Sequence, residues 1–133
     1  MPVANGGLNE FATAAFPNHA AYTLVAYTNA VGSLTATSVA ADVSVVTTSN
    51  GYAPITLTPA NWSVSSTGVA TYPTAGTIWT ATGSWSGTVN GVAIIYSTKL
   101  IAYQDFTGVA PIPGPWVASN ARKLQVDLNT LLG

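Results

Sequence analysis

Short alternating segments separated by turn-forming residues constrain the fold of this chain more than any other feature. From Tyr22 onward, β-branched and aromatic residues recur between Gly, Pro, Asn and Ser, and helical periodicity is nowhere sustained. Such alternation is typical of strands with one buried face. The expected strands are 22–28, 43–48, 52–58, 77–87, 92–97, 99–106 and 123–131. Short strands without helices predict an all-β protein, an antiparallel β-sandwich or jelly roll, with a closed barrel as second choice.

Two Asn-Gly dipeptides lie between expected strands, the first at 50–51 and the second at 90–91. Both residue types tolerate positive φ, so the dipeptide is a strong hairpin signal. The first predicts that 43–48 and 52–58 pair antiparallel, and the second predicts another turn. Pro54 cannot donate a ladder hydrogen bond, which places it at a sheet edge or a bulge.

Side-chain alternation also predicts which residues are buried. The segment 77–87 puts Trp79 and Trp85 on the same side of one strand, and in a sandwich we favour the core for both. The closing segment 123–131 turns its aliphatic residues to one face, namely Leu124, Val126 and Leu128.

The chain divides once along its length. Residues 1–18 are small and irregular, which predicts an N-terminal arm, and residues 19–133 form the predicted β-sandwich domain. The segment 107–119 holds three prolines, which exclude a central strand and favour an extended crossover between the last two strands.

Charge is scarce, since charged residues make up 5% of the chain against about 25% in a typical soluble domain. A net charge of −1 lies close to the neutrality that favours association. Three cationic side chains cannot neutralise several phosphates, so nucleic acid is not expected as a partner. No run approaches the ~18 apolar residues of a membrane span. The N-terminus, MPVANGGLNEF, lacks the basic start and apolar block of a secretory signal.

Few residues are suited to catalysis. Cysteine is absent, and His19 is the only histidine, so thiolate chemistry, histidine relays and multi-histidine metal sites cannot be built within one chain. The carboxylates lie in four separate segments and are interpreted as solvated or turn-capping groups: Glu10, Asp42, Asp105 and Asp127. No nucleophile elbow or phosphate-binding glycine spacing occurs. We therefore expect no enzyme, no metal and no cofactor.

Aromatic side chains are the remaining candidates for a recognition surface, because exposed Trp and Tyr stack on sugars and anchor protein interfaces. The proline-rich crossover adds a possible contact loop. Trp116 is balanced between core and interface, and Trp62 is favoured as a plug of the sandwich. The candidate interface residues are Trp62, Trp85, Pro113, Pro115 and Trp116.

The order of segments is distinctive as a whole. YTLVAYTN is followed by GYAPITLTPANW, TGVATYP, WTATGSW, NGVAIIYS, KLIAYQDF and LQVDLNTLLG. Over about residues 22–132, this order resembles the small all-β virion proteins of tailed bacteriophages, cyanophages among them.

The resemblance implies a capsid decoration or cement protein with a jelly-roll-like sandwich. It implies a homotrimer that binds the major capsid protein, is made in the host cytoplasm and is located on the capsid surface of the virion. The alternative is a fibre- or tail-associated, lectin-like module that binds host glycans. The scaffold positions implied by the resemblance are Tyr52, Leu57, Trp62, Tyr72, Pro73, Trp79, Gly83 and Trp85.

Overall fold

Antiparallel strands make up nearly all of the regular structure. The computed structural model describes residues 22–58, 63–64, 70–71, 73, 76–109, 112–126 and 128. The strands are β1 (Tyr22–Tyr27), β2 (Ile55–Leu57), β3 (Ser63–Val64), β4 (Ala70–Thr71), β5 (Ile78–Thr80), β6 (Gly91–Tyr96), β7 (Lys99–Asp105) and β8 (Lys123–Gln125). A short 3-10 helix, η2 (Ala40–Asp42), lies between β1 and β2. The predicted all-β class is confirmed.

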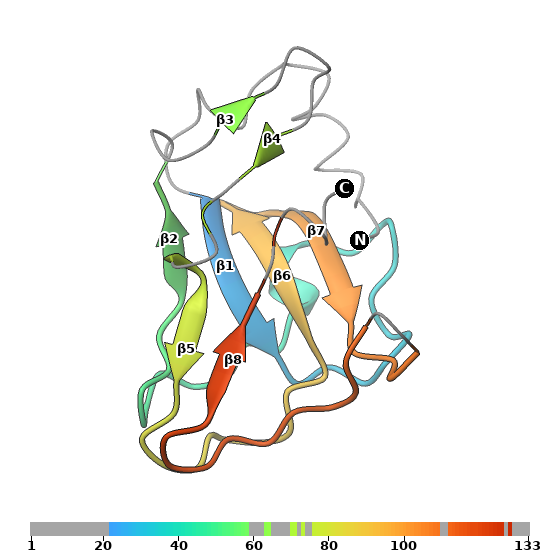
Figure 1. The fold of residues 1–133 in the computed structure, drawn as a ribbon. Coiled ribbons are helices and arrows are strands. Elements are labelled where there is room, and N and C mark those ends of the chain that lie inside the picture. Colours follow the sequence, from blue (N-terminus) through green and yellow to red (C-terminus); the bar gives the residue numbers. More distant parts are fainter. Residues whose placement is uncertain are drawn as a thin grey trace.

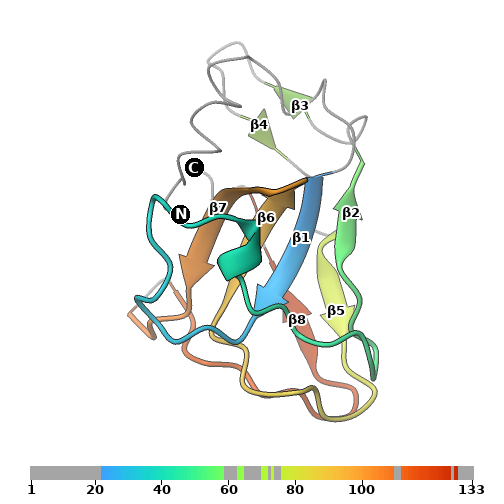
Figure 2. The same cartoon turned by 180° about the vertical axis from the view of Figure 1, so that it is seen from behind.

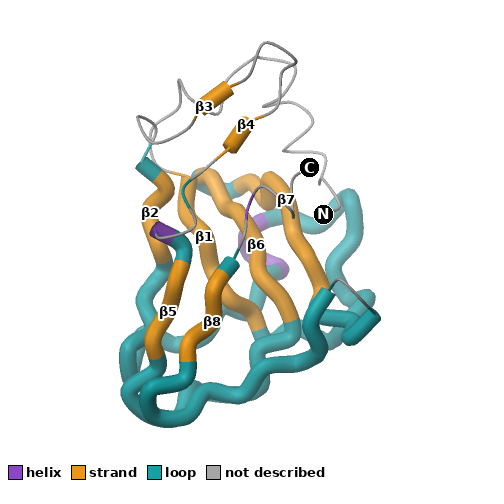
Figure 3. Tube along the Cα trace, viewed as in Figure 1, coloured by secondary structure: helices purple, strands orange, loops and turns teal. Residues whose placement is uncertain are grey.

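The strands form two layers (Figures 1 and 3). Four of them make one antiparallel sheet in the order β2-β1-β6-β7, and β5 pairs with β8 in front of that sheet. β3 and β4 pair separately as a small antiparallel ladder. Among the described strands no ladder joins β5–β8 to the four-stranded sheet, so the arrangement is a β-sandwich rather than the closed barrel.

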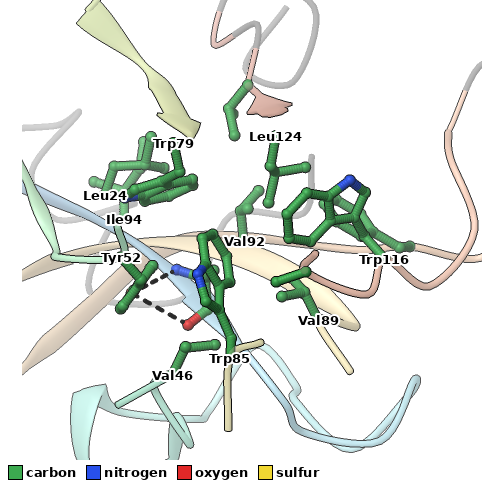
Figure 4. Packing of buried hydrophobic residues seen from close by; sticks show 14 of the residues in the cluster. Leu24, Val46, Tyr52, Trp79, Trp85, Val89, Val92, Ile94, Trp116 and Leu124 are labelled. Atoms are coloured by element: carbon green, nitrogen blue, oxygen red, sulfur yellow. Dashed lines mark hydrogen bonds between the residues drawn. The ribbon is translucent and has the colours of Figure 1, made fainter. Parts of the chain in front are cut away.

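The main core fills the space between the two layers (Figure 4). Leu24 of β1 and Ile94 of β6 project into it from the large sheet, while Trp79 of β5 and Leu124 of β8 project from the small one. Exposed Ile78, Thr80, Lys123 and Gln125 alternate with these buried residues. The two-residue period of the β5–β8 layer therefore follows the burial that the sequence predicted.

A second layer of side chains covers the opposite face of the large sheet. Val25, Ala93 and Tyr103 pack there against Leu34 and Val43 from the segment after β1. Figure 2 shows this segment, with η2, lying across β1 and β6. Both faces of the large sheet are thus buried, which is why β6 reads as a nearly continuous apolar run.

One irregularity lies in the hairpin of β6 and β7. Their register shifts between Ile94 and Ile95. As a result Leu100 and Tyr103 both face the second layer, while Ile101 between them faces the sandwich core. A bulge of this kind lets one strand supply both layers with apolar side chains.

The first Asn-Gly turn forms as predicted, but the predicted strand pairing across it is wrong. Asn50 and Gly51 have φ of 47° and 85°, and the Tyr52 amide donates to the Ser49 carbonyl at 2.8 Å, as in a type I′ turn. β2 then pairs with β1, and the segment 43–48 makes only an isolated bridge, Tyr27 with Val45. Both segments instead pair with β1, whose residues are buried in both core layers.

The second Asn-Gly predicted a turn and does not form one. Gly91 is instead the first residue of β6, where it lies opposite Tyr27 at the end of the β1–β6 ladder. The predicted strand 77–87 is also too long, because β5 ends at Thr80. Beyond it the Thr82 amide donates to the Asn50 carbonyl at 2.9 Å, which draws the chain away from the ladder toward the first turn.

Three other strand predictions agree with the structure, whereas the predicted strand 123–131 is too long, because β8 ends at Gln125. The segments 22–28, 92–97 and 99–106 match β1, β6 and β7 to within one residue at each end. Pro54 immediately precedes β2, an edge strand, as its missing N–H required. Leu124, Val126 and Leu128 are all buried, as predicted.

The predicted N-terminal arm, 1–18, lies outside the described residues. Across the part of the chain that is described, no helix has the length and apolar character needed to cross a membrane.

Candidate interaction surface

A chain of contacting aromatic rings runs through the sandwich core. Ring centroids are 5.4 Å apart for Tyr52 and Trp79, 5.0 Å for Tyr52 and Trp85, and 5.0 Å for Trp85 and Trp116. Trp85 and Trp116 are only 7% and 8% exposed. The structure therefore places both of these predicted interface residues in the core, where their rings are not available as an exposed recognition surface.

The indoles also tie loops to one another. Trp79 Nε1 donates to the Ala53 carbonyl at 2.7 Å, and Trp85 Nε1 donates to the Asn50 carbonyl at 3.0 Å. Trp85 lies in the loop after β5 rather than on that strand, so its burial comes from this loop packing and not from strand alternation. Both tryptophans thus hold the turn at 49–52 against the core.

Tyr52 connects the same turn to β1. Its hydroxyl accepts a hydrogen bond from the Ala26 amide at 3.0 Å and lies 3.4 Å from the Ala26 carbonyl. Burial raises the pKa of Tyr52 to about 12, and the hydrogen bond with the Ala26 backbone offsets part of the rise. The phenol is therefore a neutral structural group at physiological pH.

Trp116 anchors the proline-rich crossover that leads to β8. Its backbone forms a two-way bridge with Val89, at 2.7 and 2.9 Å. The Arg122 guanidinium lies 5.0 Å from the Trp116 ring centroid, in a cation–π contact, and donates to the Val117 carbonyl at 2.8 Å. The buried Trp116 ring and the Arg122 side chain thus fix the crossover to the rest of the domain.

This crossover carries exposed apolar residues. Val109 is 70% exposed and Val117 is 54% exposed, and Pro113 and Pro115 are exposed as well. We refer to these four residues as the crossover surface. The Gly108 amide donates to the Pro113 carbonyl at 3.0 Å, which closes the loop that carries Val109, while Pro115 and Val117 flank Trp116.

Sequence reasoning found part of this surface. Pro113 and Pro115 were candidates and lie exposed, whereas Val109 and Val117 were missed. Their position beside the prolines could have indicated their exposure. A segment that cannot join a sheet has no strand alternation to turn its apolar side chains toward the core. Trp62, the remaining candidate, lies outside the described residues.

Two of the four carboxylates can be placed, and both bind backbone groups. Asp42 Oδ2 accepts the Val39 amide at 2.9 Å and so caps η2, which agrees with the turn-capping interpretation. Asp105 accepts the Tyr27 hydroxyl at 2.8 Å and the Gly32 amide at 2.9 Å. Burial, followed by the hydrogen bond to Asp105, raises the pKa of Tyr27 far above its usual range. Glu10, Asp127 and His19 lie outside the described residues.

No group of three or more His, Cys, Asp or Glu side chains that could hold a metal is found among the described residues.

Of the other scaffold positions, Leu57 is fully buried and Pro73 is exposed. Gly83 lies against the Asn50 side chain, which a Cβ would approach to 3.3 Å. Tyr72 lies outside the described residues.

Comparison with known proteins returns no relative for this chain: no family model, no curated protein and no solved structure matches it.

Proposed function

We propose that this chain is a structural protein of a bacteriophage virion, a decoration or cement protein that binds and stabilises the capsid shell as an oligomer. The observation that carries the proposal is the crossover surface. It comprises exposed Val109, Pro113, Pro115 and Val117, on a crossover whose Trp116 is bridged to Val89, in a chain whose charged residues amount to 5%.

An anchored loop suits permanent attachment. Because the loop is held by the Val89 bridge and by Arg122, little conformational freedom is lost when a partner covers it. Each Å² of apolar surface buried contributes roughly 25 cal/mol. The surface carries no charge that would have to be desolvated without a partner, a cost of several kcal/mol for a buried ion.

The alternative, a lectin-like module of a fibre or tail, has less support. Stacking on sugars needs an exposed aromatic face, and Trp79, Trp85 and Trp116 are all buried. Trp62 is the candidate that keeps this alternative open. Tryptophan fluorescence titrated with host surface polysaccharide tests it, and a saturable change would favour glycan binding over shell binding.

The finer features of the proposal follow the resemblance. The sandwich would have jelly-roll connections, the arm at 1–18 would contact a neighbouring copy in the assembly, and copies would form a homotrimer on the capsid surface.

The first experiment is mass spectrometry of purified particles of the phage that encodes this chain. A decoration protein is expected in a copy number comparable with that of the major shell protein. A handful of copies would point instead to a vertex or tail part, and absence from the particle would overturn the proposal.

The second experiment tests the crossover surface directly. Particles that lack the protein are mixed with wild type, with Val109→Gln/Val117→Gln, or with the control Val31→Gln, since Val31 is a similarly exposed valine (49%) on a different loop. Leaving amides poorly paired in an apolar contact is expected to weaken shell binding at least about tenfold. Equal binding by both variants would remove the crossover surface from the contact.

A further inference from the structure

The outer edge of β8 carries backbone groups that no strand of the described chain uses. β8 pairs with β5 in the register Trp79 with Leu124. The Ala81 amide donates to the Arg122 carbonyl at 2.8 Å, and the Val126 amide donates to the Thr77 carbonyl at 2.9 Å. Bonded pairs recur at every second residue of an antiparallel ladder, so Arg122, Leu124 and Val126 direct their backbones at β5.

Lys123 and Gln125 must then direct their N–H and C=O groups the other way. Both residues are exposed, and no hydrogen bond from either backbone to another described segment is formed on that side. In Figures 1 and 3, β8 has β5 on one side and no described strand beside it on the other. The opposite edge of the small sheet is different, because Asn50 accepts the Thr82 amide there.

We propose that the outer edge of β8 pairs antiparallel with β8 of a second copy of this chain, in a register centred on Leu124. Lys123 then lies opposite the partner's Gln125, and Gln125 lies opposite the partner's Lys123. Each such pair exchanges two hydrogen bonds, so every outward N–H and C=O of the two residues is satisfied. Addition of a strand to an open sheet edge is a common mode of protein recognition.

A second copy fits this edge because the edge is complementary to itself. The register sets each lysine opposite a neutral amide, so no like charges face one another across the strands, and the net charge of −1 per chain opposes association only weakly. The contact is isologous and closes at a dimer. It rests on the self-association in the proposed function but forms a dimer, and the contact of the proposed trimer would use a different surface.

Substitutions of Gln125 test the register with opposite expected signs. Gln125→Glu sets a carboxylate opposite each lysine, and Gln125→Lys sets two like-charged pairs across the strands. With two cross-strand pairs per dimer, we expect Gln125→Glu to tighten and Gln125→Lys to weaken the dimer by about 2- to 30-fold. Lys123→Glu combined with Gln125→Lys restores opposite charges and should restore the dimer.

Analytical ultracentrifugation from low to high micromolar concentration measures these dissociation constants. Gln125 is exposed in the monomer, so circular dichroism should be alike for all variants. A monomer at every concentration would overturn the proposal, as would a dimer that Gln125→Glu and Gln125→Lys affect alike.

Gln125→Pro removes an outward donor without touching the bonds from Leu124 to β5, and Gln125→Thr is its matched control. Loss of both donors should weaken the dimer about tenfold or more in the proline variant alone. Hydrogen exchange supplies a readout that does not depend on substitution. The Lys123 and Gln125 amides should gain protection as concentration rises, while the Leu124 amide is protected throughout.

Failure of these tests is distinguishable from failure of the proposed function. Shell binding is measured with the Val109 and Val117 variants on particles, whereas the β8 contact is measured on free protein. Concentration-independent exchange at Lys123 and Gln125 would refute the β8 contact alone.

Discussion

Gly91→Ala should be among the most destabilising single substitutions in this chain. Gly91 lies in β6 opposite Tyr27 of β1 on one side and opposite Asp105 of β7 on the other. The Tyr27 hydroxyl reaches across β6 to donate to Asp105 at 2.8 Å. A Cβ on residue 91 would overlap Cζ and Oη of Tyr27 and the carbonyl oxygen of Gln104, so the ring cannot keep its place.

The magnitude follows from three effects. Overpacking a tight site costs about 1–3 kcal/mol. Loss of the hydrogen bond between Tyr27 and the Asp105 carboxylate costs about 1.5–3 kcal/mol, and reduced freedom of the unfolded chain returns about 0.4–1 kcal/mol. The expected net loss is about 1.5–5.5 kcal/mol, a large part of the roughly 5–15 kcal/mol that stabilises a domain.

Urea unfolding followed by tryptophan fluorescence measures this loss. Gly114→Ala is the matched control, because its Cβ would meet only Gly108 Cα at 3.8 Å, and it should stay within about 0.5 kcal/mol of wild type. In Tyr27→Ala/Gly91→Ala the overlap with the ring is gone and only the overlap with the Gln104 carbonyl remains, so the double variant should lose less than the sum of the single ones. A loss below about 1 kcal/mol for Gly91→Ala, or strict additivity, would refute the reasoning.

Three further predictions concern the tyrosines and the sheet edge. Tyr52→Phe leaves the buried Ala26 amide without its acceptor and should lower the free energy of unfolding by about 1–3 kcal/mol, as read from urea midpoints; an unchanged midpoint would show that water replaces the hydroxyl. The pKa of Tyr52 is raised to about 12 and that of Tyr27 is raised as well, while an unfolded tyrosine loses its proton near pH ~10. Stability should therefore be unaffected by these groups below about pH 10 and fall as pH rises above it, with a shallower fall in Tyr52→Phe. Pro54→Val restores a donor beside the edge strand β2 and should lower solubility in light scattering; unchanged solubility would remove edge protection as the role of Pro54.

Local patterns predicted the parts of the fold that depend on local geometry. Runs of β-branched and aromatic residues located β1, β6 and β7, because strand-favouring composition is a property of each segment alone. The Asn50-Gly51 turn was predictable for the same reason, since positive φ at both residues is a local preference. Pro113 and Pro115 were predictable as exposed residues of a crossover, because proline cannot serve a central strand.

Pairing and burial were not predictable in this way, because they depend on residues far apart in the sequence. β2 joined β1 instead of 43–48, since β1 is shared by both core layers. The sequence left the position of Trp116 open between core and surface, because its burial depends on contacts with the distant Trp85 and with Arg122.

The sequence by itself determined that this chain is all-β, where three of its longest strands lie, and that its surface is poor in charge. Only the tertiary structure decided what the second Asn-Gly is for. Gly91 belongs to a dipeptide typical of turns, but its missing Cβ leaves room for the Tyr27 ring that reaches Asp105. That requirement exists only once β1, β6 and β7 lie side by side.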